Sequence, residues 1–135
     1  MFKITFFPEQ FIWVAHPEGM KLSLADVTEG EAVFVSGKLM DPEFVRGVTG
    51  HHVAFTAAMA RDYERGERGS GNEKMLLLQP RPGAVVLGTV LLKLTRADID
   101  ALDRFEQVPA LRTKSPLRVT IGAHERMATT YLLRE

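Results

Sequence analysis

The chain contains no cysteine, which excludes disulfide bonds, thiol catalysis and cysteine-ligated metals. It has no excess of charge of either sign, because 17 Lys and Arg residues balance 17 Asp and Glu residues. A chain without net charge is poorly suited to nucleic acid or an anionic membrane surface. It also lacks an uninterrupted apolar run of about 18 residues, the length of a membrane-spanning helix. We therefore expect neither nucleic acid nor a membrane among its partners.

The composition that remains is that of one soluble domain. The 135 residues are 45% hydrophobic and 25% charged, so we expect a hydrophobic core that is stable without disulfide bonds or other cross-links. The apolar N-terminal stretch lacks the basic start of a signal peptide and is broken by Pro8, Glu9 and Gln10. The sequence therefore predicts a cytoplasmic location.

The first residues predict a β-hairpin. Apolar and polar side chains alternate over residues 2–6, and a second apolar run at 11–15 follows a short Pro-containing link. Residues 22–24 either add a short strand or cover a sheet edge. We expect sheet structure here because several large side chains need burial, against a barrel edge or a partner chain: Phe2, Ile4, Phe6, Phe11, Trp13 and Val14.

The rest of the chain alternates strand patterns with two helix patterns. Asp41 as a cap and Pro42 at the first helical position predict one short helix, which Gly47 or Gly50 ends. Thr95 caps the other helix. The remaining elements are strands at 32–39 and 52–63, a loop at 64–72, two strands joined at 82–83, the second helix at 95–106 and a terminal hairpin turning at 123–125. This pattern predicts an α+β domain of seven or eight strands whose sheet curls.

One carboxylate stands out in the second helix. Ile99, Leu102 and Phe105 centre an apolar face, and Glu106 lies only about 40° from that centre. One interpretation is a frayed helix end whose last side chain turns into water. The other is a carboxylate held against apolar walls, where burial raises its pKa and suits it to general acid–base work. Helix geometry alone leaves both open.

Two short motifs resemble a known family. The strand "VFVSGKL" at 33–39 is followed by "LGTV" at 87–90, then by "LDRFEQVPALR" at 102–112 and "LRV" at 117–119. This order resembles the gamma-glutamylcyclotransferase-like family, and the helix end is most similar to the gamma-glutamylamine cyclotransferases. In that family a strand ends in a Tyr-Gly-X-Leu-like loop, and a later helix ends in Leu-Asp-X-X-Glu.

The resemblance implies a fold and a division of the chain. It implies a small mixed β-barrel-like sheet with two helices, extended by the N-terminal β-hairpin. We accordingly expect an extension at residues 1–31 and the family domain at 32–135. A homo-oligomer is left open.

The resemblance also implies a reaction and a site. Ser36, Gly37, Lys38 and Leu39 stand where the family's loop binds the γ-glutamyl moiety through backbone N–H groups. Glu106 stands at the position of the proton acceptor. The implied substrate is a small γ-glutamyl amine or peptide, whose α-amine attacks its own γ-carbonyl to give 5-oxoproline and a released amine. The implied site needs no cofactor and no metal.

Three departures from the family pattern support an alternative function. Ser36 and Arg112 replace tyrosines, and Lys38 replaces a residue that is often small and polar. The added positive charge favours a non-catalytic domain that binds a small anionic metabolite or a protein. The retained Glu106 favours the enzyme.

Two other features have functional interpretations that we consider weaker. His51 and His52 are adjacent, so on a strand they face opposite ways, and no carboxylate has ligand spacing to them. We therefore expect no metal there. The glycines at 66, 69 and 71 do not follow a phosphate-loop order. For the loop at 64–72, a lid over the Glu106 pocket is favoured over a nucleotide site.

Overall fold

A computed structural model describes residues 1–69 and 75–134 of the chain. Over these residues it contains seven β-strands, three α-helices and one 3₁₀ turn. In chain order they are β1 (Phe2–Phe7), β2 (Ile12–Pro17), α1 (Leu24–Thr28), β3 (Val33–Val35), η1 (Lys38–Met40), α2 (Pro42–Thr49), β4 (Ala54–Arg68), β5 (Met75–Leu92), α3 (Arg96–Phe105), β6 (Arg112–Ile121) and β7 (His124–Leu133).

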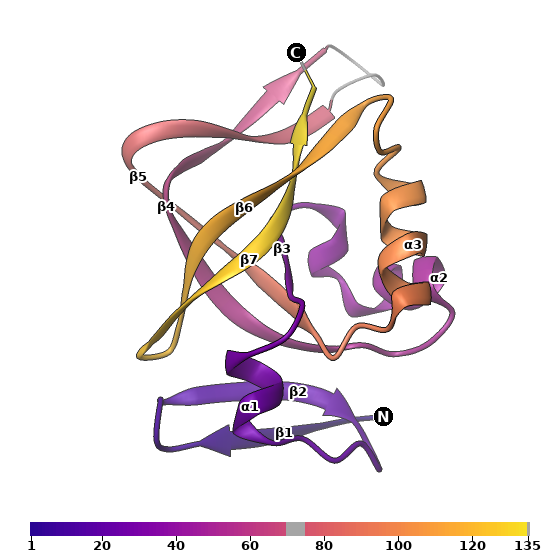
Figure 1. Ribbon diagram of the computed structural model, residues 1–135, viewed down its shortest axis with the longest axis vertical. Coiled ribbons are helices and arrows are strands. Elements are labelled where there is room, and N and C mark those ends of the chain that lie inside the picture. The colour runs from indigo at the N-terminus through magenta and orange to yellow at the C-terminus, as the bar shows by residue number, and fades with distance from the viewer. Residues whose placement is uncertain (70–74, 135) are drawn as a thin grey trace.

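Five of the strands close into a mixed barrel, as Figure 1 shows. The sheet order is β1-β2-β4-β5-β3-β7-β6, and an additional pairing of β4 with β6 closes the ring. The pairing of β3 with β7 is parallel, whereas β3 with β5 and β6 with β7 are antiparallel. The expected α+β, barrel-like fold with an N-terminal hairpin is confirmed.

β3 and β5 approach each other closely in the barrel wall, and this close approach determines the position of the loop that follows β3. Phe34 is almost fully buried in the barrel core. Gly88 on β5 faces it, and a Cβ atom at Gly88 would lie 2.5 Å from the Val35 carbonyl oxygen and 2.6 Å from the Phe34 ring. Only glycine permits this approach. The end of β3, and the loop after it, are therefore held against the barrel wall.

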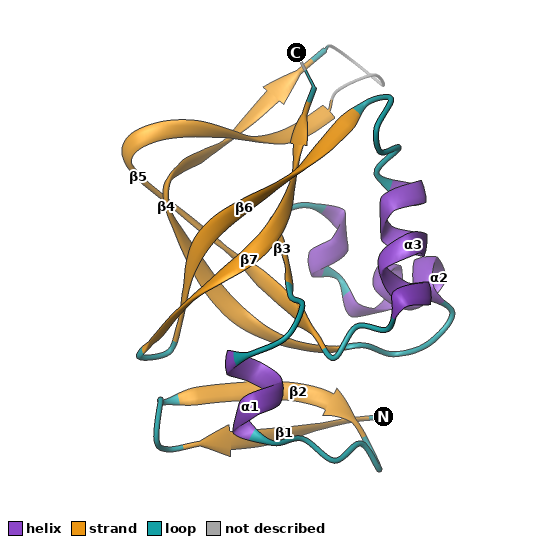
Figure 2. Ribbon diagram, viewed as in Figure 1, coloured by secondary structure: helices purple, strands orange, loops and turns teal. Residues whose placement is uncertain are grey.

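Helices α2 and α3 pack side by side against the outside of the barrel (Figure 2). Their apolar residues Val45, Ile99 and Leu102 form a second core cluster with residues of the barrel wall. Asp41 caps α2, and Thr95 forms a capping box with Asp98 at the start of α3. In the described parts of the chain, no helix is long and apolar enough to cross a bilayer.

The N-terminal hairpin lies across one end of the barrel (Figure 1). β1 and β2 pair from Phe2 opposite Pro17 to Phe7 opposite Ile12, and Ala15 pairs with Phe55 of β4. One face of the hairpin belongs to the barrel core, because Phe7, Ile12 and Val14 are buried there. The other face is exposed. Ile4, Phe11 and Trp13 are 62%, 69% and 62% exposed, so the expected burial against a barrel edge is wrong for these three. Their burial against a partner chain stays a prediction. The proposed boundary at residue 31 stays a prediction.

The segment between hairpin and barrel is a helix, which corrects the short strand considered at residues 22–24. Ser23 and Asp26 form a capping box that begins α1, and a local cap of this kind favours a helical turn over an extended one. Arg126 of β7 then holds the segment to the barrel. Its guanidinium donates to the carbonyl oxygens of Val27 (2.7 Å) and Gly30.

Strands β4 and β5 are longer than the local pattern predicts. The loop expected at 64–72 is wrong as far as residue 68, because β4 continues to Arg68 paired with β5; residues 70–74 lie outside the described chain. The two strands expected on either side of 82–83 are one. The Gly83 N–H donates to the Asp62 carboxylate at 2.9 Å, where the register shifts between Arg61 and Tyr63. Such a bulge bends a strand without ending it.

Candidate functional site

A cavity of about 530 Å³ opens between the end of β3, the C-terminal end of α3, the starts of β5 and β6, and the ends of β4 and β7. All five residues selected from the sequence, Ser36, Gly37, Lys38, Leu39 and Glu106, line it. The remaining lining residues are Phe34, Val35, Arg65, Leu77, Leu78, Phe105, Gln107, Leu111, Arg112, Thr130 and Tyr131. The fold thus joins the two sequence motifs, which lie about 70 residues apart, in one concave site of the size that small ligands occupy.

Glu106 ends α3 and is held in the cavity. Its backbone N–H still donates to the Leu102 carbonyl at 2.9 Å, so the last helical turn is intact. Gln107 then turns the chain away with a positive φ of 57°. The Glu106 side chain is 15% exposed. The interpretation of a frayed end in water is therefore wrong, and burial raises the pKa of this carboxyl above its ordinary value.

Arg112, at the start of β6, is the ionic partner of Glu106. Its Nε atom lies 2.7 Å from Glu106 Oε2, and its side chain is 14% exposed. The guanidinium opposes the rise in the pKa of Glu106, but the effect of burial is larger. The sequence indicated extra positive charge at Arg112, yet it did not predict this pairing. The short segment between α3 and β6 brings the two side chains together.

A hydrogen-bonded layer lies beside this pair. The Tyr131 hydroxyl of β7 donates to Asp103 Oδ1 at 2.7 Å, and the Lys114 ammonium of β6 donates to Asp103 Oδ2 at 3.1 Å. Burial and the bond to Asp103 both raise the pKa of Tyr131, so its hydroxyl keeps its proton. Asp103 therefore ties the last turn of α3 to two barrel strands. This fixes the backbone that carries Glu106.

The loop after β3 forms the opposite wall. Leu39 anchors it in the second core cluster, and Lys38 extends over the ring of Phe44 with Nζ 5.9 Å from the ring centroid. A Cβ atom added at Gly37 would meet no atom within 4 Å. Packing within the protein does not require glycine there, so the absent side chain leaves room beside the cavity.

The lining is rich in positive charge. Lys38, Arg65 and Arg112 contribute cations, whereas Glu106 is the one carboxylate among the described residues that line the cavity. The Arg65 guanidinium donates to the Leu87 carbonyl oxygen, which holds it at the wall. A cavity of this charge attracts an anionic ligand, or one with a carboxylate at one end.

Comparison with known proteins identifies the family. A family model described as "Gamma-glutamyl cyclotransferase, AIG2-like" matches residues 33–135. The chain belongs to this family. The resemblance read from the two motifs is therefore confirmed. No curated protein matches the sequence.

Solved structures share the fold of this gamma-glutamyl cyclotransferase family member. One named "Gamma-glutamyl cyclotransferase" is 17% identical with a TM-score of 0.67, over 79% of this chain and 68% of that one. An uncharacterised protein from Homo sapiens is 18% identical with a TM-score of 0.68, over 78% and 67%. A protein from Arabidopsis thaliana is 20% identical with a TM-score of 0.66, over 76% and 68%. At these identities the similarity shows the fold.

Two cavity residues of this family member were not singled out in the sequence. Arg65 belongs to the segment 64–72, which was expected to be a loop that covers the Glu106 pocket as a lid. Arg65 does line the cavity, but as part of β4, where the long pairing with β5 carries it to the wall. Tyr131 lies in the last strand, outside either motif. The one available signal was its polar hydroxyl within an otherwise apolar strand end, because a buried tyrosine hydroxyl usually has a partner.

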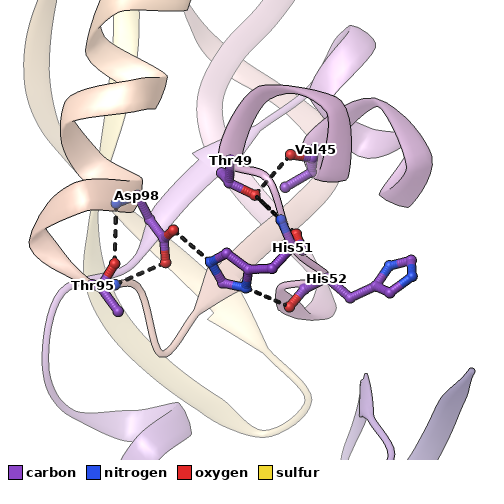
Figure 3. Close-up of polar contacts among 6 residues, drawn as sticks. All are labelled: Val45, Thr49, His51, His52, Thr95 and Asp98. Atoms are coloured by element: carbon purple, nitrogen blue, oxygen red, sulfur yellow. Dashed lines mark hydrogen bonds and ion pairs between the residues drawn. The ribbon is translucent and has the colours of Figure 1, made fainter.

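Neither of the two adjacent histidines is among the residues that line the cavity. Figure 3 shows the contacts of His51: its Nε2 lies 2.6 Å from Asp98 Oδ1, and its Nδ1 lies 3.0 Å from the His52 carbonyl oxygen. No carboxylate has ligand spacing to these histidines in the sequence, and the carboxylate that contacts His51 comes from α3, 47 positions away. Within residues 1–69 and 75–134, no group of three or more candidate metal-binding side chains is present.

Proposed function

We propose that this protein is an enzyme that cyclises a γ-glutamyl amine or peptide to 5-oxoproline and releases an amine. The observation that carries the proposal is the position of Glu106. Its carboxylate is mostly buried, has a raised pKa and shares a cavity with the Ser36–Leu39 loop. Membership of the gamma-glutamyl cyclotransferase family supports the same assignment.

In the proposed reaction Glu106 acts first as a base and then as an acid. It takes a proton from the substrate α-ammonium, which frees the nitrogen lone pair to attack the γ-carbonyl carbon. The carbonyl oxygen becomes an oxyanion, and in this proposal it is stabilised by amides of the Ser36–Leu39 loop, whose residues line the same cavity. Glu106 then gives this proton to the leaving nitrogen and takes the second proton from the ring nitrogen, which is positively charged after the attack. The oxyanion collapses to the carbonyl of 5-oxoproline as the bond from the γ-carbon to the leaving nitrogen breaks and the amine departs, and Glu106 releases its last proton to the amine or to water. Because nucleophile and carbonyl belong to one molecule, the chief requirement is that the cavity holds the substrate folded.

Arg112 has two effects in this scheme. In the free protein its guanidinium stabilises the charged form of Glu106 and so opposes the rise in pKa that burial causes. When substrate enters, the same guanidinium is available to the α-carboxylate. Sharing Arg112 with the substrate removes part of the stabilisation of Glu106 and makes it a stronger base.

A second candidate function is a binding domain that performs no chemistry. The observation that favours it is the excess of cations in the lining, with Ser36 and Arg112 at positions where the family motif has tyrosine. On this alternative the cavity binds a small anionic metabolite or a protein segment, and the Glu106–Arg112 pair is part of the wall.

A product assay separates the two. Purified protein is incubated with a panel of γ-glutamyl amines and γ-glutamyl peptides, 5-oxoproline is quantified, and binding of the same compounds is measured by calorimetry. We expect turnover of at least one compound by the parent and none by Glu106→Gln. The matched control is Asp100→Asn, an exposed carboxylate of the same helix. Binding without turnover in the parent would contradict the enzyme and support the binding domain.

A further inference from the structure

The outer face of the N-terminal hairpin is apolar and exposed, which is unusual for the solvent side of an antiparallel sheet. The register places Phe2, Ile4 and Phe6 of β1 opposite Pro17, Ala15 and Trp13 of β2 on this face. We call these six residues the outer hairpin face. The rings of Phe6 and Trp13 are in contact, with centroids 4.3 Å apart.

Most of this face is free of the barrel. The opposite face attaches the hairpin through Phe7, Ile12 and Val14 in the barrel core. At one end of the outer hairpin face the Phe2 ring packs edge-on against His52 and Phe55, so the open part of the face is formed by Ile4, Phe6 and Trp13. On the outer face Ile4 and Trp13 are each 62% exposed and Phe6 is 37% exposed. Residues 1–32 also lie before the part of the chain that the family model matches. The face is therefore a feature of the addition that precedes the matched family region.

We propose that the outer hairpin face is a self-association surface, on which a second copy of this chain docks its own hairpin across a two-fold axis. The absence of charged side chains on this face supports a second copy of the chain as the partner. The face carries no charged side chain, so it offers nothing to select a partner of opposite charge. In a two-fold contact the same patch meets itself, and apolar side chains meet apolar side chains without like-charge repulsion. The zero net charge of the chain adds no long-range repulsion.

The area is also of the right size. A whole aromatic side chain contributes about 150–250 Å², so Ile4, Phe6 and Trp13, with the exposed Phe11 in the adjoining turn, leave on the order of 500 Å² of apolar surface in water. A standard interface buries about 800 Å² on each partner. Most of that area is present, and β1 is the edge strand of the sheet, so its open backbone edge enlarges the contact. Because the area is somewhat smaller than that of a standard interface, we expect a weak dimer that dissociates on dilution.

Trp13 makes this testable without a label, because it is the single tryptophan of the chain. Sedimentation velocity and Trp13 emission are measured on the intact chain from about 1 to 200 µM, a range that brackets weak association. We expect the sedimentation coefficient to rise from monomer to dimer with concentration. Trp13 emission should shift to shorter wavelength in step, because the indole leaves water.

Two variants and one matched control locate the contact. Ile4→Thr/Phe6→Thr keeps strand-forming residues and the Trp13 reporter, and Trp13→Lys places like charges across the two-fold axis. Both should remain monomeric throughout, with the far-UV circular dichroism of the parent. The control Leu87→Thr removes a side chain that is 66% exposed on β5, two strands from β2. It should dimerise like the parent.

Three results would overturn the proposal. The first is a parent that stays monomeric at the highest concentration, and the second is a dimer that persists in both variants. The third is a loss of association in Leu87→Thr as large as that in the hairpin variants, which would indicate non-specific hydrophobic association. None of these outcomes depends on whether the cavity is catalytic.

Discussion

The two ends of α3 each carry a carboxylate removed from water, and the two are in opposite situations. Asp98, in the first turn, is only 3% exposed, yet it accepts hydrogen bonds from the Thr95 backbone N–H and from His51. Glu106, at the other end, is 15% exposed and has Arg112 as its ionic partner. The helix dipole favours a negative charge at the N-terminal end and disfavours one at the C-terminal end.

The difference explains why one carboxylate is structural and the other is suited to chemistry. Asp98 is held by the helix terminus, the cap and the imidazole at once, so its contacts are those of a structural residue. Glu106 has burial and the helix terminus against its charge, with Arg112 in its favour, so a proton can be gained at modest cost. A charge poised in this way is what a general base and acid needs.

The largest expected effect is on turnover, from Glu106→Gln. The amide keeps the size and shape of the side chain but cannot accept a proton, so kcat should fall by roughly 10²–10⁴-fold. The melting temperature should fall, because the mostly buried Arg112 guanidinium loses its carboxylate partner, although the amide oxygen can still accept a hydrogen bond from it. Steady-state kinetics and calorimetric melts check both. Asp98→Asn, at the other end of the same helix, should leave kcat unchanged; equal losses in the two variants would remove the distinction between the ends.

The next effect is on stability, from Arg112→Leu. It leaves the Glu106 carboxylate buried without its cation, which should cost about 3 kcal/mol near pH 7. The pKa of Glu106, already raised, should rise further. A carboxyl whose pKa is higher in the folded than in the unfolded state makes stability fall as pH rises from the unfolded value to the folded one. Urea melts should therefore show the variant recovering toward the parent at low pH. In Glu106→Gln/Arg112→Leu this pH dependence should disappear.

A smaller effect is expected from Asp98→Asn. The variant keeps an oxygen for the Thr95 backbone but loses the charged hydrogen bond to His51, at a cost of about 2 kcal/mol. Urea melts at pH 6 measure it. Asp100→Asn is the matched control. This carboxylate is half exposed and its ion pair is with the exposed Arg96, so the substitution should cost little. Equal costs at the two positions would show that the cap and the imidazole add nothing to Asp98.

The smallest effect is the pH dependence of the His51–Asp98 pair. Both ring nitrogens of His51 face oxygen acceptors, which favours the doubly protonated ring. The bond to Asp98 raises the pKa of His51 above its ordinary value. Its stabilisation is therefore full below the unfolded pKa of about 6.5 and is lost as pH rises through the folded pKa. Because His51 is 49% exposed, we expect about 1 kcal/mol or less. The difference in unfolding free energy between parent and His51→Ala, measured from pH 5 to 9, should shrink across this window; a constant difference would contradict the pairing.

The features that the sequence predicted well are those set by neighbouring residues. The capping residues Asp41 and Thr95 begin their helices where expected, since a cap bonds within three residues of itself. The alternation at residues 2–6 predicted β1 for the same reason, and the position of Glu106 beside the apolar face of α3 was readable from helical periodicity. The motifs around Gly37 and Glu106 indicated the family.

Only the tertiary structure decided which distant residues meet. His51 pairs with Asp98, which lies 47 positions away. Arg65 reaches the cavity because β4 continues, paired with β5, past the shift in register. The ionic partner of the buried Glu106 is Arg112. No local pattern encodes these contacts, because they depend on how the barrel closes and where α3 lies against it. The two faces of the hairpin show the same limit. The more apolar face, with Ile4, Phe6 and Trp13, is the exposed one. The face that carries Phe7, Ile12 and Val14 into the core also holds polar side chains, so only the packing of the chain determines which face is core.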